Sequence, residues 1–269
     1  CYRNDEAAIL TKSTVWFAGF NQFQPNFLQM LGESLAGCFL FGTNNYNGVL
    51  WTIPYLFSGA LVVYLAAYLV GENPFRYVVY LVMLLAAVKT DIYFAGIFLG
   101  FAASDFFCTR QKGMELWRRF WLLPLGSFVL GVYLLSYPSI GSDMSGTIYG
   151  ILPSAYTTLY HLAGAALLLA GVLGLPGLQR FFGAKPFRFL GKVSYSLYLL
   201  HFPVIATFSC WLFLSLYGKM SYGLLTAFDF VCTLTLVLIL SALSRKYLEP
   251  VSGRLTAGIS KTFAGMKKE

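Results

Sequence analysis

Seven long apolar stretches, separated by short polar or basic gaps, constrain this chain more than any other feature of its sequence. They lie at about residues 49–70, 75–88, 92–108, 120–137, 155–175, 193–217 and 222–248. A helix needs about 20 apolar residues to cross a bilayer. Only 11% of the residues are charged, whereas soluble domains carry about 25%. The sequence therefore predicts an all-α, multi-pass transmembrane helix bundle of about seven spans, integral to an endomembrane or the plasma membrane.

The positive charges predict how this bundle is oriented. Lys and Arg gather at 109–119, at 176–192 and in the tail, whereas the gap at 138–154 contains Asp143 and neither Lys nor Arg. Because cytoplasmic loops carry the excess of Lys and Arg, the amino end is expected outside and the carboxyl end inside. This placement accounts for the net charge of +8 and predicts a lipid bilayer, not a nucleic acid, as the partner. The expected domains are a lumenal or extracellular segment at 1–48, the bundle at 49–248 and a basic cytoplasmic tail at 249–269.

The first 48 residues leave two interpretations open. Phe27–Leu35 is either a short amphipathic helix in the membrane interface or a loop packed on the bundle. Asn44–Gly48 has the composition of a turn. The five cysteines lack the CxxC spacing of metal sites, so they are interpreted as small buried apolar residues, and no metal site is predicted. The chain begins with Cys and shows no signal peptide, so we expect an N-terminally incomplete protein.

One apolar stretch, the sixth, carries three polar side chains on one helical face. Ser194, Tyr198 and His201 stand at i, i+4 and i+7. An ionisable side chain near the middle of a bilayer is a functional-site hypothesis, and a structural histidine bonded to a neighbouring helix is the alternative. Pro203 lacks an amide proton, so it should leave the carbonyl of Leu199 without its helical partner and kink the helix.

Other polar groups of the apolar stretches have simpler interpretations. His161 lies where interfacial rings are common. Asp229 is explained equally well by a bond between helices, by pairing with Lys219 or by a function. Asp105 and Glu249 lie near the expected cytoplasmic ends, where solvated or salt-bridged roles are favoured.

Four motifs resemble those of the acyltransferase-3 family of multi-pass membrane acyltransferases, in particular its fungal-like branch. The resemblance covers about residues 40–255, and the most specific motif is the third of the four: Leu50-Trp51-Thr52-Ile53-Pro54 with Phe57, Phe94–Leu99 with Asp105, Leu190–His201, and Tyr247-Leu248-Glu249-Pro250. The resemblance implies ten spans with both ends in the cytoplasm. Seven spans with an outside amino end agree with three missing upstream helices.

The resemblance also implies an activity and its co-substrate. Family members transfer an acyl group, usually acetyl, from acyl-CoA to a hydroxyl of a glycan, lipid or small hydrophobic acceptor, and acyl-CoA is a co-substrate with no bound cofactor. The implied substrate channel is lined by Ser194, Tyr198, His201, Trp51 and His161. Arg188 and Lys192 are expected to contact the phosphates of acyl-CoA, although the positive-inside rule also explains them.

Two departures from the family pattern concern catalysis. The family's catalytic histidine, which follows an arginine by some eleven residues in the first helix, has no counterpart in this chain. Leu56 stands where the family has Glu, and an aliphatic side chain cannot accept a proton. We therefore assign no catalytic residue within the chain and expect it to be inactive alone.

Three alternative functions remain at this stage. Leu56 is compatible with a degenerate, non-catalytic relative. A central histidine beside a proline also suits a transporter, although no internal repeat is evident. Seven spans with the amino end outside is a receptor topology, but an acidic residue followed by Arg does not close the third span and no Asn-Pro-x-x-Tyr motif lies in the last.

Overall fold

The computed structural model describes residues 4–12, 17–20, 23–71, 73–109, 111–138, 144–254 and 256–257. Arg110, Asp143 and the lysines of the basic tail lie outside these residues. The described residues form helices and turns, with no β-strand among them. They divide into two compact units: unit 1 comprises Cys1–Pro54 and Lys185–Glu269, and unit 2 comprises Tyr55–Ala184.

The long helices confirm an integral, multi-pass, all-α membrane protein. Within the described residues, five helices are long and apolar enough to cross a bilayer: Gly48–Val70, Ile92–Thr109, Ser154–Gly174, Lys185–Leu216 and Tyr222–Arg254. A sixth span results if the pair Gly113–Arg119 and Leu122–Leu135, bent by 85°, is counted as one. The predicted span at 75–88 forms a helix of only 15 residues, Arg76–Thr90. Five or six spans are therefore visible where the sequence predicts about seven.

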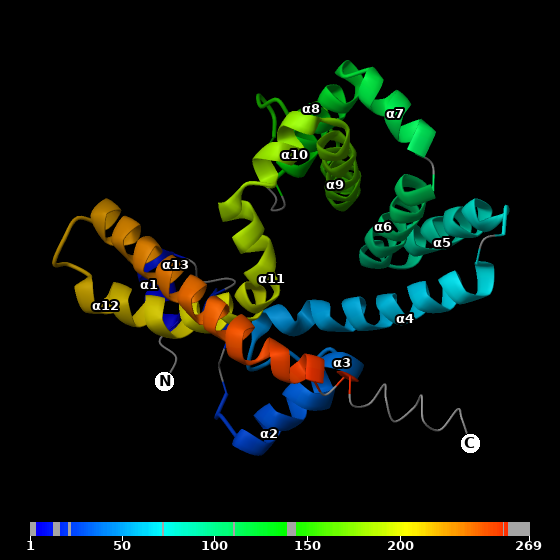
Figure 1. Ribbon diagram of the computed structural model, residues 1–269. Coiled ribbons are helices and arrows are strands. Elements are labelled where there is room, and N and C mark those ends of the chain that lie inside the picture. Colours follow the sequence, from blue (N-terminus) through cyan, green and yellow to red (C-terminus); the bar gives the residue numbers. More distant parts are fainter. Residues whose placement is uncertain are drawn as a thin grey trace, which may run out of the picture. The chain divides into compact units, whose positions relative to one another are not determined.

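Unit 2 is a succession of helices in chain order (Figure 1). Its elements are α4 (Ile53–Val70, which begins just inside unit 1), α5 (Arg76–Thr90), α6 (Ile92–Thr109), α7 (Gln111–Arg119), α8 (Leu122–Leu135), the 3-10 turn η4 (Ser154–Tyr156), α9 (Thr157–Gly174) and α10 (Pro176–Phe182). Helices α8 and α9 approach each other through glycines. A Cβ added at Gly131 would lie 2.5 Å from the amide nitrogen of Leu168, and one added at Gly171 would lie 2.7 Å from Cα of Phe128. Small residues allow such backbone contact between membrane helices.

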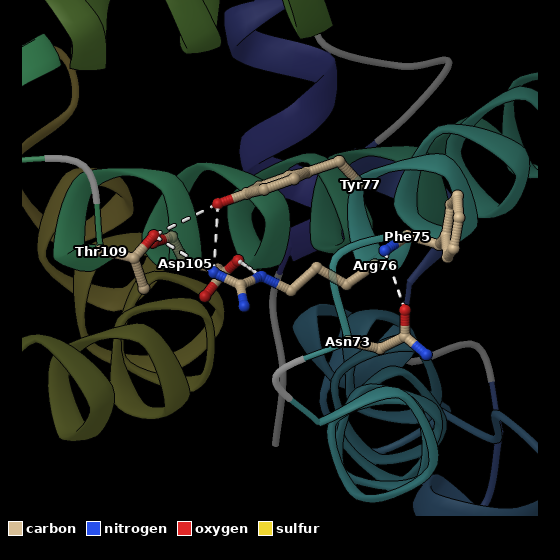
Figure 2. Close-up of polar contacts among 6 residues, drawn as sticks. All are labelled: Asn73, Phe75, Arg76, Tyr77, Asp105 and Thr109. Carbon is tan, nitrogen blue, oxygen red and sulfur yellow. Dashed lines mark hydrogen bonds and ion pairs between the residues drawn. The ribbon is translucent and has the colours of Figure 1, made fainter.

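An ion pair fastens the short helix α5 to α6 (Figure 2). The Arg76 guanidinium donates from Nε to Oδ2 of Asp105 over 2.8 Å, and a second nitrogen lies 3.3 Å from the Tyr77 hydroxyl and 3.4 Å from that of Thr109. Both charged side chains are mostly buried, with 14% and 20% of their surface exposed. Asp105 therefore forms a salt bridge, which is one of the two roles, solvated or salt-bridged, that the sequence favours for it.

Unit 1 combines an N-terminal and a C-terminal segment of the chain. Its elements are α1 (Asn4–Thr11), η1 (Phe17–Gly19), α2 (Phe27–Gly32), the π-helix η2 (Glu33–Gly37), α3 (Cys38–Leu40), η3 (Gly48–Thr52), α11 (Lys185–Val204), the π-helix η5 (Ile205–Ser209), α12 (Cys210–Leu216) and α13 (Tyr222–Tyr247). Helix α13 returns along α11, η5 and α12 and contacts all three. Near the carboxyl end of α13, the buried Ser196 hydroxyl of α11 lies 3.1 Å from the Ser244 hydroxyl and donates to Glu249 over 3.1 Å.

Within the segment before the first span, Phe27–Leu40 forms a short apolar helix. Leu28 and Leu35 are 74% and 71% exposed, as an interfacial helix requires, although its place at the interface stays a prediction. On the other side, the buried Glu33 carboxylate accepts from Nδ2 of Asn45 and from the amide of Tyr46, both over 3.0 Å. These bonds hold the predicted turn against the helix.

Candidate functional site

The sixth apolar stretch is positioned by hydrogen bonds to the segment that opens the first span. The Tyr198 hydroxyl donates to the carbonyl of Val49 over 2.7 Å and lies 2.7 Å from Oγ1 of Thr52. These two partners belong to η3, the single turn at the start of the Gly48–Val70 span. Tyr198 therefore joins α11 to η3 and is half-buried between them.

The carbonyl that Pro203 leaves without a helical partner is satisfied from a distant residue. Nδ2 of Asn47 donates to the carbonyl of Leu199 over 2.9 Å. The same side chain accepts from the amide of Val49 and so caps η3. Beyond Pro203 the helix continues and widens into the π-helix η5. The predicted loss of one backbone bond is thus correct, and Asn47 compensates for it.

The ring of His201 has a defined tautomer when it is neutral. Nδ1 lies 2.7 Å from the carbonyl oxygen of Tyr198 and 3.3 Å from that of Leu197. A carbonyl oxygen only accepts, so Nδ1 carries the proton and Nε2 is the acceptor nitrogen. Nδ1 of His201 bonds to its own helix, which leaves Nε2 as the ring nitrogen that can accept a hydrogen bond from a ligand.

His201 lines a cavity of about 390 Å³ in unit 1. One wall comes from the continuous helix α11–η5–α12 and the other from α13, and residues of α1 and η1 complete the lining. On the first wall the lining residues recur every four positions: Leu197, His201, Ile205 and Ser209. Steps of four drift around an α-helix of 3.6 residues per turn. The wider turn of η5 reduces that drift, and π-bulges of this kind occur frequently at functional sites.

Asp229 lies on α13, the wall of this cavity opposite the wall that carries His201. Its Oδ2 accepts from the Ser209 hydroxyl over 2.6 Å, and its Oδ1 accepts from the Thr233 hydroxyl over 3.4 Å. The bond to Ser209 joins α13 to η5, so the helix–helix bond is the interpretation of Asp229 that the structure shows. Sequence reasoning missed Ser209 altogether, because a serine in an apolar helix carries no signal of its own.

The other predicted channel residues have the following surroundings within their own units. Ser194 is exposed and donates to the carbonyl of Gly191 in its own helix over 3.0 Å. Trp51 is 41% exposed in η3. His161 belongs to unit 2, where Nε2 lies 2.8 Å from the carbonyl oxygen of Tyr137. Within unit 1, the rings of Tyr198 and His201 lie close to each other, with centroids 5.8 Å apart.

The predicted basic residues Arg188 and Lys192 are exposed, and so is Leu56, which stands where the family pattern has Glu. Arg188 and Lys192 are exposed on α11, between the start of that helix and His201. Leu56 is 55% exposed on α4. All three positions are open to a ligand or to lipid, and the roles predicted for them stay predictions.

The cysteines differ in burial, and within the described residues no group of His, Cys, Asp and Glu has the arrangement of a metal site. Cys38 and Cys210 are buried, Cys232 is half-buried and Cys108 is exposed. Burial raises the pKa of the Cys38 thiol, which therefore stays neutral and behaves as a small apolar group. The interpretation as small buried residues thus describes Cys38 and Cys210 but not Cys108.

Comparison with protein families identifies the class to which this helical bundle belongs. The chain matches the family model of the acyltransferase domain, that of the acyltransferase-3 family, over residues 9–245. The protein therefore belongs to this family of membrane-embedded acyltransferases. Searches of curated proteins and of solved structures returned no significant match. The predicted family is confirmed, and the fungal-like branch stays a prediction.

Proposed function

We propose that the protein takes part in transferring an acyl group, acetyl in the simplest case, from acyl-CoA to a hydroxyl of a glycan, lipid or small hydrophobic acceptor. In this reaction the acceptor oxygen attacks the thioester carbonyl, an ester bond forms, and the carbon–sulfur bond breaks. The hydroxyl proton leaves with coenzyme A as its thiol. The observation that carries the proposal is His201, an ionisable side chain of a membrane span, in the wall of an otherwise mainly apolar cavity.

The donor would approach along α11 from its basic start. Arg188 and Lys192 are exposed there and have the charge to hold the phosphates of acyl-CoA. At 1.5 Å per residue, His201 lies about 20 Å beyond Arg188 along the helix. Ser194 and Tyr198 lie between them along the length of the helix, and we assign them to the wall along which the pantetheine and acyl chain would extend. Trp51 and His161 are proposed for the same channel on the family resemblance alone.

We assign the role of general base to no residue of this chain. Leu56 has no proton-accepting group where family members have Glu. His201, held by its own helix, is assigned to the channel wall. The 269-residue chain is therefore expected to bind acyl-CoA without turning it over.

Photolabelling with an acyl-CoA that carries a diazirine on its acyl chain tests the donor site. Labelling of α11 should be saturable and displaced by unlabelled acyl-CoA. The double variant Arg188→Gln/Lys192→Gln should weaken it severalfold, because it removes two phosphate contacts. Lys219→Gln, at a lysine that is also exposed and lies in the turn between α12 and α13, is the matched control and should have no effect. Labelling that ignores the double variant would contradict the assignment of these two residues.

A turnover assay tests the expected inactivity separately. Membranes that contain the chain are incubated with radiolabelled acetyl-CoA, and ester products are separated from the thioester. The chain and its His201→Ala variant should give the same background. Product formation that exceeds this variant would show that the chain carries its own catalytic groups.

A further inference from the structure

The membrane carboxylate of Asp229 has more hydrogen-bonding capacity than its neighbours use. An ionised carboxylate offers about four acceptor positions. Ser209 occupies one position well, at 2.6 Å, and Thr233 contributes a long bond of 3.4 Å. Within the described part of the chain no cation pairs with Asp229. An acidic group in a membrane span is costly without partners, so a donor supplied by a ligand would stabilise it.

The rest of the cavity is shaped for an apolar body. Leu197, Ile205, Phe213 and Val237 line it together with Asp229. A few polar side chains, Asp229 among them, in a mainly apolar cavity of about 390 Å³ are the arrangement of sites that bind small amphiphiles. The lining also includes two side chains at the outer surface of α13, Phe230 and Leu234, which are 65% and 42% exposed. A ligand dissolved in the bilayer can therefore enter beside them.

The position of the cavity separates it from the donor's approach. Its lining on the first wall runs from Leu197 to Phe213, toward the turn that joins α12 to α13. The basic residues Arg188 and Lys192 lie toward the opposite end of the same helix. Nε2 of His201 is an acceptor nitrogen in this lining. A ligand that enters from the α12–α13 end would meet it.

We propose that this cavity binds the acceptor of the acyl transfer, a hydroxyl-bearing amphiphile whose hydroxyl donates to Asp229 and whose apolar body fills the space up to His201. This inference rests on the proposed function and adds the place and chemistry of the acceptor. A neutral hydroxyl suits the site better than an ammonium group, because an ammonium group would have to lose its hydration to pass the apolar opening.

A photoreactive long-chain alcohol, a hexadecanol analogue with a diazirine in its chain, tests this site on the full 269-residue chain in vesicles. Its methyl ether lacks the donor, and its amine analogue replaces the hydroxyl by a cation. The variants are Asp229→Asn and Leu234→Trp, the second of which fills the exposed side of the cavity and keeps Asp229. Thr235→Val is the matched control, since Thr235 is exposed on α13 and bonds only to the carbonyl of Val231 in its own helix.

The alcohol should label α11–α13 at least about tenfold better than the ether, the size expected for a hydrogen bond to a charged acceptor. Asp229→Asn should abolish most of this preference, Leu234→Trp should reduce labelling by both probes, and Thr235→Val should change neither. Equal labelling by alcohol and ether, a preference that survives Asp229→Asn, stronger labelling by the amine, or labelling unchanged in Leu234→Trp would each overturn the proposal.

The two proposals fail separately. If the acyl-CoA probe labels α11 and the alcohol preference is missing, the function stands and the acceptor site is wrong. If the alcohol preference depends on Asp229 and no acyl-CoA labelling occurs, the site binds a hydroxyl amphiphile and the acyltransferase proposal fails.

Discussion

The packing of α8 against α9 predicts that a single methyl group will loosen unit 2. In Gly131→Ala the new Cβ would lie 2.5 Å from the amide nitrogen of Leu168, 2.8 Å from its Cα and 2.9 Å from the carbonyl oxygen of Gly164. All three atoms are backbone, so no side chain can rotate away. Ordinary contact begins at 3.4 Å, so the two helices must separate locally by the difference.

The size of the effect follows from two opposing contributions. Overpacking of a tight interface costs about 1–3 kcal/mol. Replacing Gly by Ala in a helix returns up to about 1 kcal/mol. Gly126→Ala, on the same helix, receives only the second contribution, because nothing lies within 4 Å of its Cβ. The difference between the two variants is therefore the cost of overpacking.

Thermal unfolding of the purified chain in detergent, followed by intrinsic fluorescence, measures this difference. A change of 1 kcal/mol shifts the melting temperature by about 2–4 °C for chains of 150–250 residues. Gly131→Ala should melt several degrees below Gly126→Ala, and Gly126→Ala should match or exceed the unmodified chain. Identical melting temperatures for the two variants would refute the close approach of α8 and α9.

Two further predictions concern bonds between distant segments. Asn47→Asp keeps the acceptor that caps η3 but loses the donor to Leu199, so it should destabilise the chain by about 1–3 kcal/mol through an unsatisfied carbonyl; a melting temperature equal to that of the unmodified chain would contradict this. Arg76→Met and Asp105→Leu should each lower the melting temperature by leaving a mostly buried charge without its partner, whereas the double variant should recover part of the loss. The same thermal assay measures that recovery, and strictly additive losses would show that the ion pair contributes nothing.

Hydropathy along the chain was sufficient to predict the class of fold, because crossing a bilayer is a local requirement on about 20 consecutive residues. The third and fifth apolar stretches became helices within a residue or two of their predicted ends, at Ile92–Thr109 and Ser154–Gly174. The missing helical partner of the Leu199 carbonyl followed from Pro203 alone, since a proline's effect on its own helix is also local. The motifs that resemble the acyltransferase-3 family likewise needed no structure.

Hydropathy was less informative about helix ends and bends. The sixth span begins at Lys185, eight residues before its predicted start, because the backbone hydrogen bonds continue through basic residues that lower the hydropathy. The predicted fourth span at 120–137 is a helix of 14 residues, bent by 85° from the one before it. Backbone bonding, not side-chain polarity, sets these boundaries.

Only the tertiary structure decided which polar groups work together. Ser194 and His201 share a helical face by spacing and both bond to their own helix, yet Ser194 is exposed and His201 lines a cavity. Asn47 reaches Leu199 across 152 positions of sequence. The hydrogen-bond partner of Asp229, Ser209, lies on a π-helix that no local sequence pattern predicts. Such partners depend on how helices pack after they form, and packing is set by shape and by contacts between distant residues, which hydropathy does not record.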